Sequence, residues 1–478
     1  MSVALTSVGP LWVHSRSRYE FEKGTLPLLT CRLLTRKPIY LRMKEEKLVR
    51  GLGRWDLTAM GVNTIIGTGI FLLPSKIMDL VGSYSIFAFI ACAVVVGFIV
   101  LCFAEVSSRF QTTGGMYLYA REAFGKTVGF ETGWLYWITR IAVFAAVCNA
   151  FLIYLGFFAP GVNEGWLRIG IICAIVTAVT SINLLGIRQS AITTNIFTIG
   201  KIVPLLTFVA IGAFFVHPSN FSFGEVPPTS KFSEVILLLI YTLGGFETAV
   251  IPAGETKDPR KNVPFALLTA IAVCAVLFIL VQIVAIGTLP DLAKSERPLA
   301  DAATAFMGSY GAGFIVVGAL ISIFGHLNGG FLAASRLPFA MAEQKDLPEI
   351  IARTHPRFKT PTWSILITAA FALFLTIQSS FLTAVTISTI ARLLVYATTC
   401  GALPLFRFRK AAPKAEFTAP FGIAASIFSL GLIVWLLTNV DYAKEGLAVI
   451  VTIAIGLVIF AGSRFFGRTK ESLPPIHE

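Results

Sequence analysis

Twelve apolar segments, separated by short polar loops, follow one another along most of this chain. A helix that crosses a hydrocarbon core of about 30 Å needs about 20 apolar residues and must satisfy its backbone hydrogen bonds internally. The composition is 55% hydrophobic and only 14% charged, and the alternating ten-residue segments of a membrane barrel are absent. We therefore predict an all-α polytopic membrane protein with 12 transmembrane helices. The segments run over residues 56–80, 83–107, 128–156, 165–186, 190–215, 233–256, 264–288, 311–343, 363–378, 380–406, 420–438 and 445–463.

The net charge of +13 raises the question of a nucleic-acid partner, but the basic residues sort by loop. If the N-terminus is cytoplasmic, the loops on the opposite side hold only Lys76, Arg168, Lys231, Lys294, Arg297 and Lys444. This asymmetry follows the positive-inside rule, so the excess charge reflects topology. We predict a multi-pass protein of the plasma or inner membrane, embedded in the lipid bilayer, with both termini cytoplasmic and no nucleic-acid partner.

Sequence signals for several other functions are missing. The seven cysteines form no CxxC pair and no metal-like cluster. The absence of a P-loop argues against ATP-driven transport by this chain, and the absence of HExxH and GxSxG argues against a membrane-embedded hydrolase. We predict no enzymatic activity, no cofactor and no metal site.

Paired glycines interrupt two of the apolar segments near their middles. The first segment contains Gly67-Thr68-Gly69, and the sixth contains Gly244-Gly245, followed by Pro252. Each glycine costs about 1 kcal/mol in a helix interior. Glycines can instead serve close helix packing, but residues one or two positions apart do not share a helix face. The spacing therefore favours two broken helices.

The two breaks lie five segments apart, which divides the chain into repeats of five helices. Because five is odd, the second repeat starts from the other side of the membrane and is inverted, as in secondary transporters with discontinuous helices. We predict a first repeat over 55–215, a second over 233–406, two accessory helices over 420–463 and cytoplasmic tails over 1–54 and 464–478. Within the first tail, we expect residues 1–42 to form an extension without a folded role; the alternatives are a disordered regulatory tail and, after it, a transit peptide.

A broken helix inside a membrane creates a polar site. The N-terminus of its second half presents free N–H groups and the positive end of a helix dipole, which suit an anion. The carbonyls that end a first half suit an ammonium group. An α-amino acid carries both groups on one carbon, so it could satisfy both kinds of helix end at once.

Four stretches resemble the amino acid-polyamine-organocation (APC) permeases. They are IIGTGIF in the first segment, FAEVSSRFQTTGGMYLYAREAFG after the second, GFETAVIPAGETKDPRKNVP from the sixth and SRLPFAMAEQKDLP after the eighth, and the resemblance covers roughly residues 50–410. It implies a LeuT-type core of five plus five helices that moves amino acids by proton symport or by exchange.

The resemblance also implies which residues bind the substrate. Its carboxylate would bind at Ile66, Gly67, Thr68 and Gly69, and carbonyls near Tyr241, Gly244 and Gly245 would take the amino group. We add Phe246, the aromatic residue after the second break, to this set.

Lys201 lies deep in the fifth segment and needs a partner there. In related transporters a lysine at the matching position approaches the unwound first helix, where sodium-coupled relatives hold a sodium ion. The resemblance therefore implies a coupling or conformational role without sodium. The alternative is a structural link to helix-end carbonyls.

Other charged residues within the segments leave two interpretations open. Glu247 either joins the two halves of the sixth segment or acts as a proton-responsive gate. Arg140 and Arg392 either pair with a carboxylate such as Glu247, or Arg140 reaches the side-chain pocket and favours acidic substrates. Glu105 is expected to pair with Arg109 or Arg121.

Aromatic residues and one histidine complete the candidate site. Related exchangers place aromatic gates at the positions of Tyr136, Tyr241 and Phe331, although forty phenylalanines make core packing the default for any one of them. His326 is either a packed, hydrogen-bonded residue or a proton relay.

Taken together, the sequence predicts a sodium-independent, proton-coupled secondary transporter that moves amino acids by alternating access. Its predicted partners are a small amino acid and protons. An amino acid exchanger is the nearest alternative, followed by a polyamine or organocation permease. An amino acid sensor that binds without transport is the alternative from another class.

Overall fold

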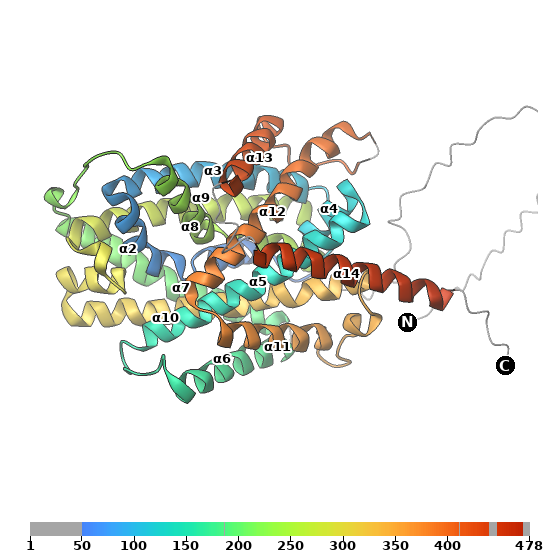
Figure 1. Cartoon of the computed structure of the whole chain (residues 1–478), viewed down its shortest axis with the longest axis horizontal. Coiled ribbons are helices and arrows are strands. Elements are labelled where there is room, and N and C mark those ends of the chain that lie inside the picture. Colours follow the sequence, from blue (N-terminus) through green and yellow to red (C-terminus); the bar gives the residue numbers. More distant parts are fainter. Residues whose placement is uncertain (1–49, 186, 411, 439–446, 472–478) are drawn as a thin grey trace, which may run out of the picture. The chain divides into compact units, whose positions relative to one another are not determined.

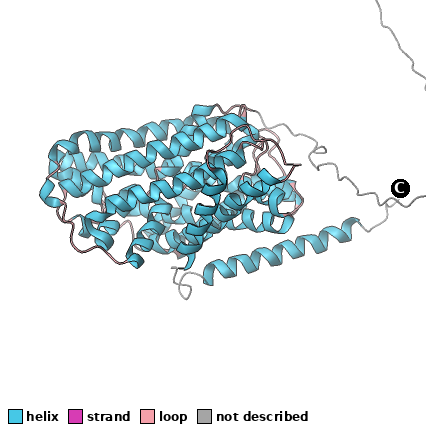
Figure 2. Cartoon of the chain, turned by 90° about the horizontal axis from the view of Figure 1, so that it is seen from above, coloured by secondary structure: helices cyan, strands magenta, loops and turns pink. Residues whose placement is uncertain are grey.

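A computed structural model describes residues 50–471, except for residues 186, 411 and 439–446. Within these residues the regular structure is helical, apart from an isolated β-bridge between Leu52 and Thr256 (Figure 2). Most of the predicted N-terminal tail, including the extension at 1–42, lies outside the described residues.

Fourteen α-helices are described. They are α1 (Arg54–Ile65), α2 (Gly69–Val81), α3 (Ser85–Ser107), α4 (Met116–Phe124), α5 (Lys126–Leu155), α6 (Gly165–Leu185), α7 (Ile187–Gly212), α8 (Thr229–Leu243), α9 (Pro259–Thr288), α10 (Pro298–Glu343), α11 (Thr362–Gln378), α12 (Phe381–Phe408), α13 (Gly422–Thr438) and α14 (Leu447–Glu471). The 3₁₀ helices are η2 (Gly82–Tyr84), η3 (Ala213–Phe215), η4 (Pro218–Asn220), η5 (Phe246–Glu255), η6 (Leu292–Lys294) and η7 (Glu349–Ala352).

The described helices are those of a polytopic membrane protein. Eight segments are long and apolar enough to cross a membrane, and one of them, Gly69–Ser107, joins α2, η2 and α3. Three shorter apolar helices cover Thr362–Gln378, Gly422–Thr438 and Val449–Ser463. Every predicted segment overlaps a described helix, while the number of twelve membrane crossings stays a prediction.

The structure departs from the predicted segments in three places. The short helix α4 was not predicted, because its nine residues include polar and charged side chains. Helix α10 begins at Pro298, before the predicted start at 311, and bends at Gly308, where φ is +66°. Helix α14 continues to Glu471, beyond the predicted end at 463.

Helix α5 lies inside the bundle, where it packs against α10, α11 and α12 (Figure 1). Most of its side chains are therefore buried. Helix α1 packs against α7, α9 and η5, and α2 packs against α8. The first half of one interrupted segment thus contacts the second half of the other, which means that the two segments run in opposite directions where they meet.

Candidate functional site

The first predicted break is confirmed. Helix α1 ends at Ile65 and α2 begins at Gly69, and the three buried residues between them, Ile66–Thr68, are not helical. Within the described residues, the N–H groups of Thr68, Gly69 and Ile70 have no backbone acceptor. These donors are the unsatisfied N–H groups that open a helix, and here they lie inside the protein.

The second predicted break is also confirmed. Helix α8 ends at Leu243, Gly244 is extended, and Gly245 adopts φ +111° before the 3₁₀ helix η5 begins. Residues with a side chain rarely adopt such a positive φ. A Cβ at Gly245 would also collide with Thr64 O. Glycine is therefore required here both by the backbone turn and by the close approach of α1.

Hydroxyl groups join the two breaks. Thr64 Oγ1 lies 2.9 Å from Gly245 O and 2.6 Å from Thr248 Oγ1, which itself donates to Gly245 O. On the other side, the Thr68 and Tyr241 hydroxyls form a hydrogen bond of 2.9 Å. The Gly245 carbonyl, which the resemblance offered to the substrate amino group, thus already has donors within the protein.

Lys201 connects α7 to the end of α1. Its Nζ atom donates to Asn63 O and Ile66 O, both at 2.7 Å, and to Ser322 O at 3.1 Å. The side chain is completely buried. Because an ammonium group has three N–H donors, these three carbonyls use all of them.

Glu247 joins η5 to α12. Its Oε2 atom accepts hydrogen bonds from Gly245 N and Tyr396 Oη, both at 2.8 Å, and its Oε1 atom lies 3.4 Å from Arg392 Nε. All three side chains are buried. The predicted pairing of Arg392 with this carboxylate is therefore present, and the same carboxylate fixes the turn at the second break.

Arg140 lies near the middle of α5, and its side chain is only 1% exposed. Its Nε and Nη1 atoms have no hydrogen-bond partner, and no ion pair among the described residues includes it. The predicted pairing of Arg140 with Glu247 is absent from these contacts. A Cβ at Gly330 of α10 would collide with the Arg140 guanidinium group.

His326 lies between Arg140 and the first break. A Cβ at Gly67 would lie 2.7 Å from His326 Nδ1, and a Cβ at Gly330 would lie 3.9 Å from His326 Cδ2. Neither ring nitrogen has a hydrogen-bond partner among the described residues, and the hydroxyl of Tyr136 lacks one as well. The Tyr136 hydroxyl and the His326 ring, both without hydrogen-bond partners among the described residues, therefore lie near Arg140.

The predicted aromatic residues divide between two sides of the site. Phe331 packs against Phe144, with their ring centroids 5.7 Å apart. Phe246 packs against Phe103 and Tyr396, at 5.4 and 5.3 Å. Phe246 therefore belongs to the contact of η5 with α3 and α12, while Phe331 lies on the α5 side.

Several contributors were missed at the sequence level: Asn63, Thr64, Thr248, Ser322 and Tyr396. Polar residues next to the glycine pairs, such as Asn63-Thr64 before the first break, could have identified some of these contributors from the sequence. No group of three or more potential metal ligands occurs among the described residues.

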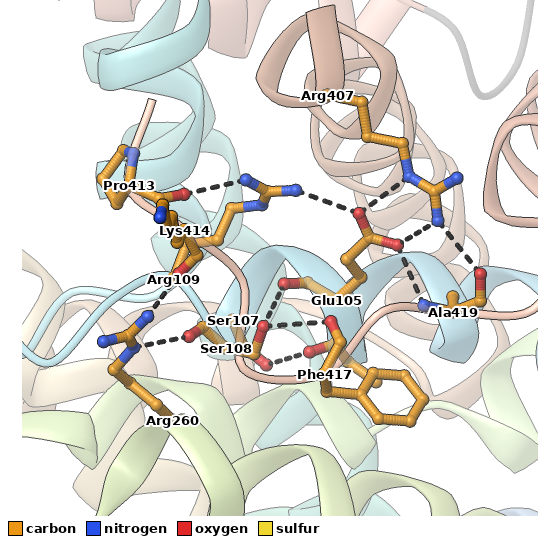
Figure 3. A network of polar contacts seen from close by, with 11 residues as sticks. Glu105, Ser107, Ser108, Arg109, Arg260, Arg407, Pro413, Lys414, Phe417 and Ala419 are labelled. Carbon is orange, nitrogen blue, oxygen red and sulfur yellow. Dashed lines mark hydrogen bonds and ion pairs between the residues drawn. The ribbon is translucent and has the colours of Figure 1, made fainter. Parts of the chain in front are cut away.

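A second polar network lies where α3 ends, away from the breaks in sequence (Figure 3). Glu105 accepts hydrogen bonds from Arg109 at 3.0 Å, from Arg407 Nε at 2.9 Å and from Ala419 N at 3.0 Å. The predicted pairing with Arg109 is confirmed. Arg121 instead contacts Asp346, which also accepts from Tyr117.

Comparison with known proteins shows that this chain is similar to transporters. A family model described as amino acid permease matches residues 52–460. The chain is 29% identical to the methylthioribose transporter of Bacillus subtilis (strain 168), over 92% of this chain and 99% of that protein. It is 28% identical to the serine/threonine exchanger SteT of that organism, over 89% and 99% of the two chains. It is 29% identical to the branched-chain amino acid permease BcaP, also of B. subtilis, over 67% and 73%.

Proposed function

This chain belongs to the amino acid permease family, and from that premise we propose that it is a secondary active transporter that carries α-amino acids across the cell membrane by alternating access. The observation that carries the proposal is the pair of broken helices, which meet in opposite directions and are joined through Thr64 and Gly245. Such paired breaks mark the substrate site of transporters built from inverted repeats.

The substrate carboxylate would bind at the start of α2. The N–H groups of Thr68, Gly69 and Ile70 are buried there without backbone acceptors, and the helix dipole favours an anion. The amino group would bind carbonyls in the last turn of α8 and at Gly244, because Gly245 O already has donors within the protein.

Lys201 supports transport without sodium. Its ammonium group already contacts the carbonyls of Asn63, Ile66 and Ser322, which are the kind of oxygen ligands that a metal cation would need. The energy source would then be a proton gradient, with exchange of one amino acid for another as the second candidate. Exchange is favoured by the similarity to a serine/threonine exchanger over nearly the whole chain.

A polyamine or other organic cation fits this site less well. Three cationic side chains, Lys201, Arg140 and Arg392, are buried around the breaks, and Glu247 is the carboxylate that contacts one of them. A cationic ligand would add a further positive charge to this region, which the low dielectric of a membrane interior disfavours.

The proposed architecture has two inverted repeats of five helices followed by two accessory helices. It places both termini in the cytoplasm, as the distribution of basic residues predicts. The antiparallel contacts of α1 with η5 and of α2 with α8 support the inversion.

Uptake into proteoliposomes would test the proposal. Purified protein should accumulate labelled amino acids under an inward proton gradient without sodium, or should exchange them when the vesicles are preloaded with the same amino acids. Saturable uptake in neither format, tested across all twenty amino acids, would refute transport.

A pair of glycine variants would locate the site. Gly67→Leu should abolish uptake, because its side chain would collide with His326 beside the first break. Gly170→Leu places the same side chain at a position of α6 with no neighbour within 4 Å, and it should leave uptake unchanged. Equal activity of the two variants would contradict a substrate site at the first break.

A further inference from the structure

Three cationic side chains are buried around the breaks, and they differ in what surrounds them. Lys201 donates to three carbonyls, and Arg392 lies 3.4 Å from a Glu247 oxygen. Arg140 is equally buried, and its Nε and Nη1 atoms, like those of Arg392, have no hydrogen-bond partner among the described residues. Unlike Arg392, it forms no ion pair with a carboxylate of the described residues. One positive charge near the middle of a membrane helix is therefore left without a counter-ion from the described part of the chain.

Two polar, uncharged side chains lie near Arg140. The Tyr136 hydroxyl and both ring nitrogens of His326 also lack hydrogen-bond partners among the described residues. An unpaired buried charge is costly, and intramembrane charges usually mark sites that bind or move ligands. Unused donors around a buried guanidinium group are complementary to an oxyanion supplied from outside the chain.

The position of Arg140 relative to the first break shows which part of a substrate it would meet. His326 separates them: its ring lies against Gly67 on one side and near Gly330 on the other, and Gly330 contacts the Arg140 guanidinium group. A ligand whose α-carboxylate binds the start of α2 would therefore need a second group, at a distance from the first, to reach Arg140.

We propose that Arg140 binds the side-chain carboxylate of the transported amino acid, so that the preferred substrates are acidic amino acids. This inference rests on the proposed function and specifies its substrate class. A guanidinium group donates charge-assisted hydrogen bonds to a carboxylate, and the Nε and Nη1 donors of Arg140, which point to different sides of the group, are unused here. Because Gly330 has no side chain, the guanidinium group of Arg140 fits against its backbone, where a Cβ atom would collide with Nη2.

Matched pairs of acids and amides would test the proposal, because glutamate and glutamine, or aspartate and asparagine, differ mainly in the terminal charge. In counterflow, the wild-type protein should prefer each acid over its amide by at least about tenfold, since a site built for a polar group rejects an analogue that leaves it unpaired. Arg140→Gln should lose this preference through reduced transport of the acid, with transport of the amide retained. Arg140→Lys, which keeps the charge, should retain part of the preference.

Arg392→Gln serves as the comparison, because Arg392 already has a carboxylate neighbour in Glu247. It should reduce transport of acid and amide alike. Thermal stabilisation of the wild-type protein by glutamate but not by glutamine gives a test that needs no variant.

Three results would overturn the inference. The first is that the wild-type protein transports the amides as well as the acids. The second is that Arg140→Gln loses acid and amide equally, which would assign Arg140 to the α-carboxylate or to the scaffold. In both cases amino acid transport itself would stand. The third is that no amino acid is transported, which would refute the proposed function as well.

Discussion

The Glu105 network and the surroundings of Arg140 are two buried charged regions with opposite arrangements. Glu105 is an anion whose two carboxylate oxygens both accept hydrogen bonds, from Arg109, Arg407 and the Ala419 N–H (Figure 3). Arg140 is a cation whose Nε and Nη1 donors have no acceptor among the described residues. The Glu105 network connects α3, α12 and the segment before α13 through hydrogen bonds. The Nε and Nη1 atoms of Arg140 connect α5 to no other element among the described residues.

This difference separates charges that hold the fold from charges that await a ligand. Removing one partner from a paired, buried ion leaves the other partner uncompensated, which is strongly destabilising. Replacing a buried charge that has no partner breaks no ion pair and removes the desolvation penalty of that charge, so the folded state is not destabilised. The same kind of mutation should therefore have opposite effects on stability in the two regions.

The largest effect is expected at Glu105. Glu105→Ala should lower the free energy of unfolding by about 3 kcal/mol or more, because Arg109 and Arg407 would lose their shared carboxylate. Thermal unfolding of the purified protein in detergent would measure it. The exposed pair of Lys76 and Asp79 offers a control, since Asp79→Ala should change stability by less than about 1 kcal/mol. Similar losses in the two variants would remove the distinction.

The next effect is expected at Lys201, a buried cation that resembles Glu105 in having all its hydrogen bonds made. Lys201→Met should abolish uptake and lower stability by about 2–3 kcal/mol, because three buried carbonyls would lose their donor. Uptake and thermal unfolding would be measured on the same preparation. Normal uptake by this variant would place the lysine outside the transport cycle.

A smaller effect is expected at Gly245, where the two broken helices touch. Gly245→Ala should cost about 2 kcal/mol and reduce uptake, through backbone strain and a collision with Thr64 O. Gly82 also has a positive φ but no neighbour within 4 Å, so Gly82→Ala imposes strain without the collision. If both variants lose uptake equally, the contact with Thr64 does not matter for transport.

The smallest effect on stability, and one of opposite sign, is expected at Arg140. Arg140→Met should leave the ligand-free protein unchanged or raise its stability by about 1 kcal/mol, since a buried charge is replaced by an apolar side chain of similar length. Thermal unfolding without added amino acids would test it. A loss as large as that of Glu105→Ala would show that Arg140 has a structural partner.

The sequence predicted the parts of this molecule that depend on local chemistry. Apolar length placed the helices, and the glycine pairs at 67–69 and 244–245 placed both breaks. The pairing of Arg392 with Glu247 also followed, because few carboxylates lie within the apolar segments.

The parts that were not predicted depend on how helices are rotated against each other. Segments that are apolar on every side give no indication of which face meets a neighbour. The hydrogen bond from Tyr396 to Glu247 and the one from Ser322 to Ile66 O could therefore not be predicted. Nor could the sequence show that Gly245 O is used by Thr64 and Thr248, because that contact joins residues far apart in the chain.

The link between Thr64 and Gly245 also has a consequence for how this protein is made. The two residues are 181 positions apart. At about 5–20 residues per second of synthesis, roughly 10–35 s pass between the production of the first broken helix and the arrival of its partner. Lys201 is synthesised within this interval and can reach the carbonyls of Asn63 and Ile66 first. The lysine can thus shield the end of α1 in the nascent chain, so its loss should increase degradation during biogenesis even before transport is measured.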